Sequence, residues 1–498
     1  MKLRSSLRAG LRTVLCAARF AVPLLAPLVA PLSMLSAAPL AASAATPSTR
    51  NCHLPGSEET LRCVTVPVAL DYAKPEAASI KLQVTVAPAF REAARPDPLF
   101  IIAGGPGQAG SDLLPLINGT FRKARATRDI VLIDQRGTGL SGRLDCASKP
   151  GDEAMDDEQI EQEARRCLAQ IKQPLAAYTT DNAARDIEQV RLALGYGKIN
   201  LWGGSYGTRL AQAYARAYPD AVRSLVLDGV AAPEQVIPAG GRDAQAALDA
   251  LFKQCAANAP CAKAFPQLGA EFAAVVERTT GKGITVELPD PRTARPSTVQ
   301  MSSKRFLGTV HSILYSPLDS RRLPFLIHSA YQNRWAPFIA RSNLMGDLSA
   351  DGAASLGLHL AVVCAEDMPR LTPQLLMEDT QGSFLGVPLV QRLHGLCEAI
   401  KVPAVPYRAP TPIAAPALLF SGVLDPVTPP RRAESALRFM THAQHVVVAN
   451  AGHGVSPLGC APRLIREFLD QPDRPVVVAC LKELPSPTFQ LGSAGPQP

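Results

Sequence analysis

The pattern of hydrophobic and polar positions changes twice along the chain and divides it into three parts. Apolar runs of strand length lie at 62–70, 80–86, 98–103, 129–133, 199–202 and 222–227. Amphipathic stretches of helical period lie at 180–194 and 208–218. Strands that alternate with helices in this way predict an α/β fold, with a mostly parallel sheet covered by helices on both faces.

The alternation stops near residue 231 and resumes after residue 410. In between, runs such as 245–257 and 268–276 predict helices, and 284–301 predicts one small hairpin. Strand and helix patterns return at 416–421, 431–440, 445–449 and 462–469. One α/β domain with a large, mainly helical insertion is therefore expected. The expected divisions are 45–230 and 411–484 for the domain, 231–410 for the insertion and 485–498 for a disordered, Pro- and Gly-rich tail.

The first 44 residues have the pattern of a secretory signal peptide. Residues 1–19 carry five basic and no acidic residues, whereas 20–44 are uncharged and end in Ala42-Ser43-Ala44, a small-x-small cleavage pattern. An uncleaved membrane anchor is the alternative, but four prolines interrupt the uncharged stretch. We expect export to the periplasm or the medium, cleavage near Ala44 and no membrane anchor afterwards.

Composition indicates a folded globular chain. Of its 498 residues, 47% are hydrophobic and 19% are charged, which is enough apolar material for a large core. The formal net charge of +8 falls to +3 without the five basic residues of the leader, and no basic run follows. The acidic run at 152–163 is expected to be a solvated helix face. Nucleic acid is therefore not expected as a partner, and the oligomeric state stays open.

Ten of the eleven cysteines lie beyond the leader, and an even number in an exported chain favours disulfides. In chain order they form five near-neighbour pairs, which are the expected disulfides, although sequence alone leaves the connectivity open. The pairs are Cys52–Cys63, Cys146–Cys167, Cys255–Cys261, Cys364–Cys397 and Cys460–Cys480. Zinc is the alternative, but the chain has no Cys-x-x-Cys or His-Glu-x-x-His motif, so no metal site is expected.

Gly203-Gly204-Ser205-Tyr206-Gly207 fits the G-x-S-x-G pattern, between a predicted strand at 199–202 and a predicted helix at 208–218. Such a turn presents the serine hydroxyl at the carboxyl ends of the strands, where open α/β sheets bind ligands. A Gly-rich turn whose serine only caps the helix is the alternative. The context favours Ser205 as a catalytic nucleophile.

A serine nucleophile needs a base, and His453 is the histidine best placed to supply it. It lies between glycines directly after the predicted strand at 445–449, where it can reach across the strand ends. Packing or surface roles are expected for the histidines of the insertion, which are His311, His328, His359 and His394.

The base in turn needs an acid that orients its imidazole. Asp425 follows the predicted strand at 416–421 and precedes His453 by 28 residues, so the order Ser, Asp, His matches one known arrangement of the triad. Asp228, after the strand at 222–227, is the alternative acid or a residue that caps a turn. We expect Asp425.

The same chemistry needs two hydrogen-bond donors for a developing oxyanion. The backbone N–H of Tyr206, directly after the nucleophile, is expected to be one. The other is expected from Gly104-Gly105, where glycine lets the backbone approach a substrate closely, and Gly105 is favoured. An ordinary Gly-Pro turn is the alternative.

Four segments together resemble the α/β-hydrolases of the proline iminopeptidase and tripeptidyl aminopeptidase group. They are 103–107 (AGGPG), 134–141 (DQRGTGLS), the GGSYG turn and 421–429 (SGVLDPVTP). The resemblance covers residues 60–480 and implies a triad of Ser205, Asp425 and His453 under a lid formed by the insertion. The last segment and the closing cysteines are similar to the secreted tripeptidyl aminopeptidase branch. Proline iminopeptidases usually have a histidine at the position of Ala103, which argues against a strictly single-proline enzyme.

An enzyme that acts on free peptide N-termini needs a carboxylate for the α-ammonium group. Glu366 and Asp367, close to Cys364 in the insertion, are the candidates, and Glu366 is preferred. A solvated acidic pair is the alternative.

Together these residues predict an exported serine hydrolase without a cofactor. The expected activity is that of an aminopeptidase, which releases short peptides or single residues through an acyl-enzyme. A carboxylesterase acting on a small ester with the same triad is the alternative, and an inactive hydrolase fold used for binding is a third hypothesis. The number of residues released and the preferred residue at the cleaved bond stay open.

Overall fold

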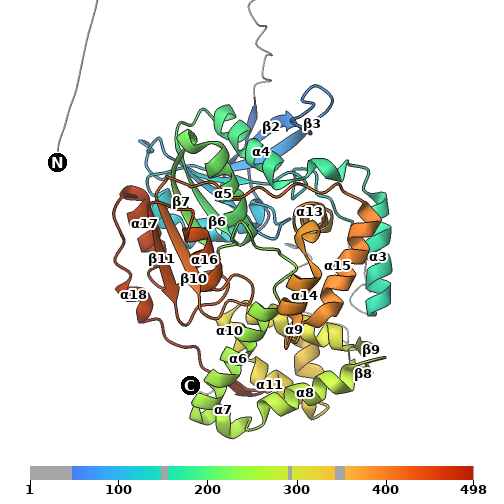
Figure 1. Cartoon of the computed structure of the whole chain (residues 1–498). Coiled ribbons are helices and arrows are strands. Elements are labelled where there is room, and N and C mark those ends of the chain that lie inside the picture. The colour runs from blue at the N-terminus through green and yellow to red at the C-terminus, as the bar shows by residue number, and fades with distance from the viewer. Residues whose placement is uncertain (1–46, 147–154, 290–293, 343–353, 497–498) are drawn as a thin grey trace, which may run out of the picture. The chain divides into compact units, whose positions relative to one another are not determined.

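A computed structural model describes residues 47–146, 155–289, 294–342 and 354–496, so the predicted signal peptide lies outside the described part. The described residues form a central sheet of nine strands in the order β1-β2-β3-β5-β4-β6-β7-β10-β11 (Figure 1). Its strands are β1 Ser48–Cys52, β2 Leu61–Ala69, β3 Ser79–Ala87, β4 Leu99–Ile102, β5 Ile130–Ile133, β6 Ile199–Gly204, β7 Val222–Asp228, β10 Ala417–Gly422 and β11 Ala443–Val448.

The strand order decides which loops meet at the carboxyl ends of the strands. From β5 to β11 each strand runs parallel to its neighbour, whereas β1, β2 and β3 form an antiparallel edge. β4 lies beside β6, with Ile102 opposite Gly203, and β10 lies between β7 and β11. The loops that follow β4, β6, β7, β10 and β11 therefore lie at one edge of the sheet.

The sheet is buried on both faces, as its continuous apolar strands predict. In β4, Phe100 and Ile102 pack into one hydrophobic cluster with α4 (Thr180–Ala193), α5 (Tyr206–Ala217) and α16 (Pro430–Leu437). Leu99 and Ile101 point to the opposite face, into a second cluster with α2 (Arg122–Arg125) and α17 (Ala461–Asp470). The alternation of side chains along one strand thus builds both halves of the core.

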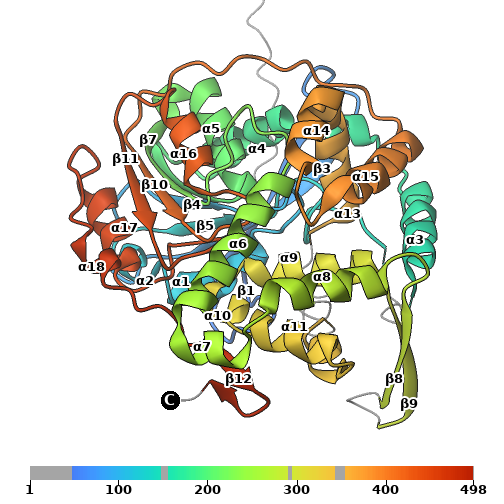
Figure 2. The same ribbon diagram turned by 60° about the horizontal axis from the view of Figure 1, so that its bottom comes forward.

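The segment between β7 and β10 is mainly helical (Figure 2). It has a hydrophobic cluster that contains Phe306, Trp335 and Phe338. Its one hairpin occupies the position predicted for it. The elements are α6 Gly241–Ala257, α7 Ala259–Ala264, α8 Leu268–Thr279, β8 Ile284–Pro289, β9 Pro296–Met301, α9 Ser303–Leu314, α10 Pro317–Ser320, α11 Leu323–Tyr331, α13 Leu356–Val362, a π-helical turn Val363–Asp367, α14 Pro373–Thr380 and α15 Gly386–Ile400. The predicted fold class, including the helical insertion, is confirmed.

The prediction of a disordered tail at 485–498 differs from the structure over 485–496. β12 (Gln490–Gly492) pairs with β13 (Gly495–Pro496), and Phe489 is buried in the cluster of the insertion. The Arg321 guanidinium lies 4.4 Å from the centre of the Phe489 ring, and the Gln490 N–H donates to the Arg321 carbonyl at 3.1 Å. The prediction rested on the polar composition of the tail and did not take into account Phe489, whose ring packs on the insertion.

The described cysteines form five disulfides, and all five are the near-neighbour pairs expected from the sequence. Cys146–Cys167 ties the segment after β5 to α3 (Asp157–Gln170), the helix that contains most of the acidic run. Cys364–Cys397 ties the π-helical turn to α15. The Cys460–Cys480 disulfide ties α18 (Ala479–Lys482), the last helix of the described chain, to the start of α17.

Candidate active site

Ser205 lies at a strained turn between β6 and α5. Its φ of 54° and ψ of −126° place a non-glycine residue in a conformation that such residues rarely adopt. The glycines around it are sterically required, because a Cβ on Gly203 would overlap the Gly207 backbone and a Cβ on Gly207 would overlap the Ile102 carbonyl. The local sequence therefore forces a turn that exposes the serine hydroxyl at the carboxyl end of β6.

His453 is held beside Asp425 on the loops that follow β11 and β10. Its Nδ1 lies 2.9 Å from Asp425 Oδ2 and 3.1 Å from the Thr428 hydroxyl, and its backbone N–H donates to the Tyr315 carbonyl at 2.8 Å. The Asp425 carboxylate is buried and accepts further hydrogen bonds from the N–H groups of Val427 and Thr428. This arrangement orients the imidazole through Nδ1, so Nε2 is the ring nitrogen that is left to exchange a proton with a substrate or nucleophile.

Burial and charge act in opposite directions on these two groups. Burial disfavours the protonated form of His453, but the charge of Asp425 and its hydrogen bond outweigh burial and raise the pKa of the imidazole. Burial likewise raises the pKa of Asp425, but the charge of His453 and four hydrogen bonds outweigh it and lower that pKa. The pair therefore favours a charged carboxylate next to an imidazole that binds a proton readily.

Asp228, the alternative acid, has a different set of partners. Its carboxylate accepts hydrogen bonds from the backbone N–H groups of Val455 and Ser456, at 2.8 and 2.7 Å. It makes no hydrogen bond with His453 among the described residues, and it anchors the loop that carries that histidine. Of the two acids, Asp425 is the one bonded to the imidazole.

Two cavities of about 400 and 330 Å³ lie against Ser205. Ser205 and His453 both line the larger, which we name the histidine cavity, although no hydrogen bond joins them among the described residues. Nucleophile–base hydrogen bonds are often long in structures without substrate. The smaller, which we name the insertion cavity, is lined by Ser205, Gly105 and Tyr206 and by residues of the insertion. The side-chain hydroxyl of Ser205 thus faces space on both sides.

The two backbone groups predicted as oxyanion donors are both free in the described part of the chain. None of its hydrogen bonds uses the N–H of Gly105 or of Tyr206. Gly105 has a φ of 103°, which favours glycine, and a Cβ on Gly104 would lie 2.9 Å from the Ser205 Cβ. The Gly104-Gly105 backbone can therefore approach the serine only without side chains.

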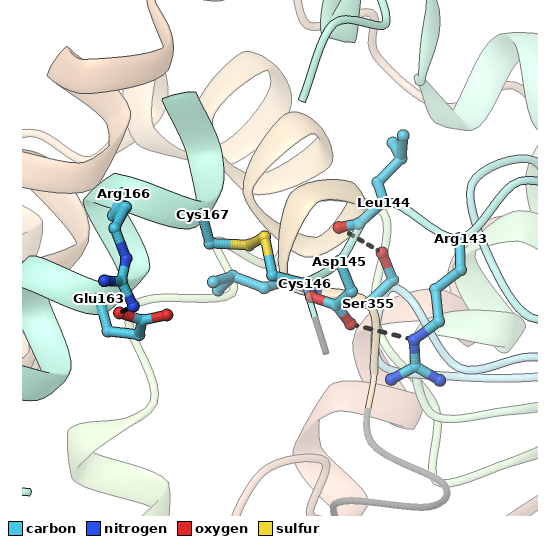
Figure 3. The surroundings of a disulfide bond; sticks show 9 residues. Arg143, Leu144, Asp145, Cys146, Glu163, Arg166, Cys167 and Ser355 are labelled. Carbon is cyan, nitrogen blue, oxygen red and sulfur yellow. Dashed lines mark hydrogen bonds and ion pairs between the residues drawn. A yellow bond between two sulfur atoms is a disulfide. The ribbon is translucent and has the colours of Figure 1, made fainter. Parts of the chain in front are cut away.

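The loop that follows β4 is braced by the start of α13. The Ser355 N–H donates to the Gly107 carbonyl at 2.8 Å, and the buried Ser355 hydroxyl donates to the Leu144 carbonyl at 3.1 Å. Figure 3 shows the second contact directly beside the Cys146–Cys167 disulfide. The disulfide thus secures the segment on which α13 rests, and α13 secures the glycine loop.

Two histidines that the sequence analysis assigned to packing or the surface line the insertion cavity instead. His311 is buried, and burial together with the charge of His453 lowers its pKa to about 4, so it is neutral at pH 7. Burial also lowers the pKa of His359, which lies next to the Pro106 backbone. Tyr315 links this region to the base, because its ring stands edge-on to the His453 ring with centroids 5.0 Å apart. No local motif marks these residues, because distant helices bring them to the site.

The structure does not bring the two predicted amine-binding acids to Ser205. Asp367 is fully buried and pairs with Arg209 at 3.0 Å and with Arg370 at 3.2 Å. Glu366 accepts two hydrogen bonds from Thr180, both at 2.6 Å, and lines a different cavity. The reason is the π-helical turn after α13, which turns both carboxylates toward α4 and α5. The acid that does line the insertion cavity is Asp379 in α14, which the sequence analysis missed.

A mostly parallel sheet with this strand order, a serine at the strand–helix turn and a His–Asp pair on later loops defines the α/β-hydrolase class. Family models agree. The α/β-hydrolase fold model matches residues 97–306, and a model described as TAP-like protein matches residues 384–480. The chain therefore has the α/β-hydrolase fold and carries a TAP-like segment.

Among curated proteins, the chain is 29% identical to "Serine protease Hip1" of Mycobacterium tuberculosis over 412 residues, which cover 74% of this chain and 76% of that protein. It is 31% identical to "Tripeptidyl aminopeptidase" of Streptomyces lividans over 196 residues, 35% of this chain and 36% of that protein. It is 34% identical to "Proline iminopeptidase" of Neisseria gonorrhoeae over 143 residues, 28% and 36% of the two chains. The protein is a serine hydrolase of this fold, and the similar proteins are named as peptidases.

Proposed function

We propose that the protein is an exported aminopeptidase that releases short peptides or single residues from free peptide N-termini. The observation that carries this proposal is the Asp425–His453 hydrogen bond next to a cavity shared by His453 and Ser205. The names of the similar proteins support peptide hydrolysis as the reaction.

In the proposed reaction, the Ser205 hydroxyl attacks the carbonyl carbon of the bond to be cleaved. His453 accepts the serine proton and then donates it to the leaving amine, while Asp425 keeps the imidazole oriented and stabilises its charged form. The free N–H groups of Gly105 and Tyr206 donate to the oxyanion of the tetrahedral intermediate. Water, activated by His453, then hydrolyses the acyl-enzyme.

The insertion cavity is the proposed site for the N-terminal residues of the peptide. Among the described residues, Asp379 is the one carboxylate in its lining, which is otherwise rich in apolar side chains such as Ile237, Leu385 and Val390. Its oxygens accept hydrogen bonds from the N–H groups of Gly241 and Arg242, at 2.8 and 3.3 Å, which hold the carboxylate in place. We assign the α-ammonium group to Asp379 in place of Glu366.

A carboxylesterase remains the second candidate, and the apolar lining of the same cavity favours it. Ala231, Pro238 and Leu393 would also accept the hydrocarbon part of an ester. The triad chemistry is the same for both reactions, so only recognition of the amine separates them.

Export is part of the proposal. Disulfides persist in oxidising compartments, and the described chain contains five of them. No helix in the described residues has the length and hydrophobicity needed to cross a bilayer. With the predicted signal peptide, these features favour the periplasm or the medium.

The test is a panel of chromogenic substrates given to the purified mature chain, with Ser205→Ala as the inactive control. The panel contains a prolyl anilide, a tripeptidyl anilide with a free amine, its acetyl-capped form and a simple aryl ester. Cleavage of the free but not the capped tripeptide supports the aminopeptidase, and Asp379→Asn should then raise KM for the free peptide alone. Turnover of the ester only would refute the peptidase proposal.

A further inference from the structure

A cavity of about 370 Å³ lies apart from the two cavities at Ser205, and we name it the basic cavity. α5 forms one side of this cavity, and residues 405–411 form the opposite side. These residues belong to the connection from α15 to β10, which Figure 1 shows crossing the helices on this side of the sheet. Four arginines line it, on α5, on the turn after α13 and on the connection. They are Arg209, Arg216, Arg370 and Arg408.

Two of these arginines have guanidinium N–H groups without a partner among the described residues. Arg216 donates one hydrogen bond, from Nε to the Thr411 carbonyl at 2.9 Å, while its Nη2 is buried without a partner. Neither Arg216 nor the more exposed Arg408 forms an ion pair with any described residue. Arg408 is exposed to water, whereas Arg216 is partly buried and feels the charge of Glu234, which itself pairs with Arg438. The Arg216 Nη2 group can therefore still donate to an anion.

The other two arginines are only partly satisfied. Arg209, whose side chain is 9% exposed, and Arg370 share the Asp367 carboxylate, and each keeps a buried Nε without a partner. Two acids also line the cavity, Asp181 and Glu366, and Glu366 is engaged by the N–H and hydroxyl of Thr180. These two acids, Asp367 and Glu234 match the four arginines in number, so the arginine N–H groups without a partner are what can hold an anion.

We propose that the basic cavity binds a small oxyanion of the phosphate or sulfate type between Arg216, Arg408 and Arg370. Guanidinium groups recognise such anions through paired, charge-assisted hydrogen bonds, and Arg216 has two terminal nitrogens free for them. The guanidinium carbon of Arg370 lies over the ring of Tyr407, 4.6 Å from its centre, so the aromatic ring helps to position that guanidinium beside the cavity.

The basic cavity is separate from the hydrolytic site but adjoins it. Thr180 lines the basic cavity, and its hydroxyl lies 2.8 Å from the hydroxyl of Tyr206, which lines the insertion cavity. Tyr206 thus stands between the two cavities. The proposed anion site does not depend on the proposed peptidase activity.

The test is equilibrium dialysis of the purified mature chain with radiolabelled phosphate at constant ionic strength, set with sodium chloride. Binding is the readout, because phosphate and sulfate stabilise most proteins by general exclusion, which would confound a stability measurement. One saturable site per chain, filled below ~10 mM phosphate and emptied by sulfate but not by chloride, is the expected result.

Variants assign the site. Arg216→Met and, at the more exposed position, Arg408→Met should each weaken phosphate binding at least ~10-fold, about 1.4 kcal/mol. Arg334→Met, which removes an exposed arginine of the insertion that lines none of these cavities, is the matched control and should bind as the unaltered chain does. No saturable binding, or equal binding by folded Arg216→Met and Arg408→Met, would overturn the proposal.

Discussion

Arg136 lies in the segment 134–141 that resembles a hydrolase motif, yet its contacts are structural. Its guanidinium is 1% exposed and forms a two-fold hydrogen-bonded pair with the buried Asp186 of α4, with both distances at 2.7 Å. It also donates to three backbone carbonyls, those of Ala69, Leu70 and Ala177. One side chain therefore joins the loop after β5 to α4 and to the end of β2.

Replacing Arg136 with methionine removes all five hydrogen bonds and leaves the Asp186 carboxylate buried, with the Tyr72 hydroxyl as its remaining side-chain donor. Removing one partner of a buried ion pair costs about 3–5 kcal/mol, because the other charge stays desolvated. We expect Arg136→Met to lower the free energy of unfolding by that amount. The double variant Arg136→Met/Asp186→Leu should recover much of it, since no charge is left unpaired.

The loss should depend on pH in a defined direction. Burial raises the pKa of Asp186, and Arg136 opposes that rise. Without Arg136 the folded-state pKa moves further above the unfolded value near 3.9, so folding becomes less favourable as pH rises above that value. Arg136→Met should therefore lose more stability at pH 8 than at pH 5.

Urea unfolding followed by tryptophan fluorescence measures these differences. Arg165→Met is the control, because it breaks an exposed pair with Glu161 that is worth about 0–1 kcal/mol. A loss below about 1 kcal/mol for Arg136→Met, or no recovery in the double variant, would refute the reasoning. The kcat of the fraction that remains folded should be unchanged, because Arg136 does not line the cavities at Ser205.

Four further predictions concern the site and its supports. Asp425→Asn should lower kcat about 10⁴-fold; a loss below 10-fold in kinetic assays would exclude the proposed role. The kcat/KM should fall as pH drops through the pKa of His453, which Asp425 holds above its ordinary value near 6.5; a midpoint below that value in the pH profile would contradict this direction. Ser355→Ala should lower kcat about 10-fold with little change in KM, since the start of α13, which braces the glycine loop, loses its hydroxyl hydrogen bond to the Leu144 carbonyl; an unchanged kcat would remove Ser355 from that role. Replacing Cys364 and Cys397 with alanine should cost about 3–4 kcal/mol for the 33-residue loop, and unchanged urea unfolding would contradict it.

Much of this molecule follows from short-range patterns in the sequence. The runs that became β4, β6 and β10 are mostly apolar over four to six residues, with Asn200 and Ser421 as the polar exceptions, which suits strands that are buried on both faces. The glycines around Ser205 are dictated by clashes with backbone only a few residues away or in the adjacent strand. The disulfides join cysteines that are near neighbours in the sequence, because closing a short loop costs less conformational entropy than closing a long one.

Other features depend on where distant segments pack. Asp228 ends β7, and Asp425 lies in the loop after the neighbouring strand β10. Only the packing of the later loops placed Asp425 against the imidazole and Asp228 against the backbone N–H groups that follow His453. The roles of the triad residues stay predictions that this geometry supports.

The insertion shows most clearly that contacts between distant segments do not follow from local sequence patterns. Glu366 has a sequence context that suits a ligand-binding acid, but a π-helical turn directs it to Thr180, while Asp379 and His311 reach the cavity beside Ser205 from other helices. Spacing along the chain defines periodicity, turns and glycine requirements, because those are set by backbone sterics over a few residues. Which side chains share a cavity is set by how helices pack across a hundred residues or more, and only the folded chain decides that.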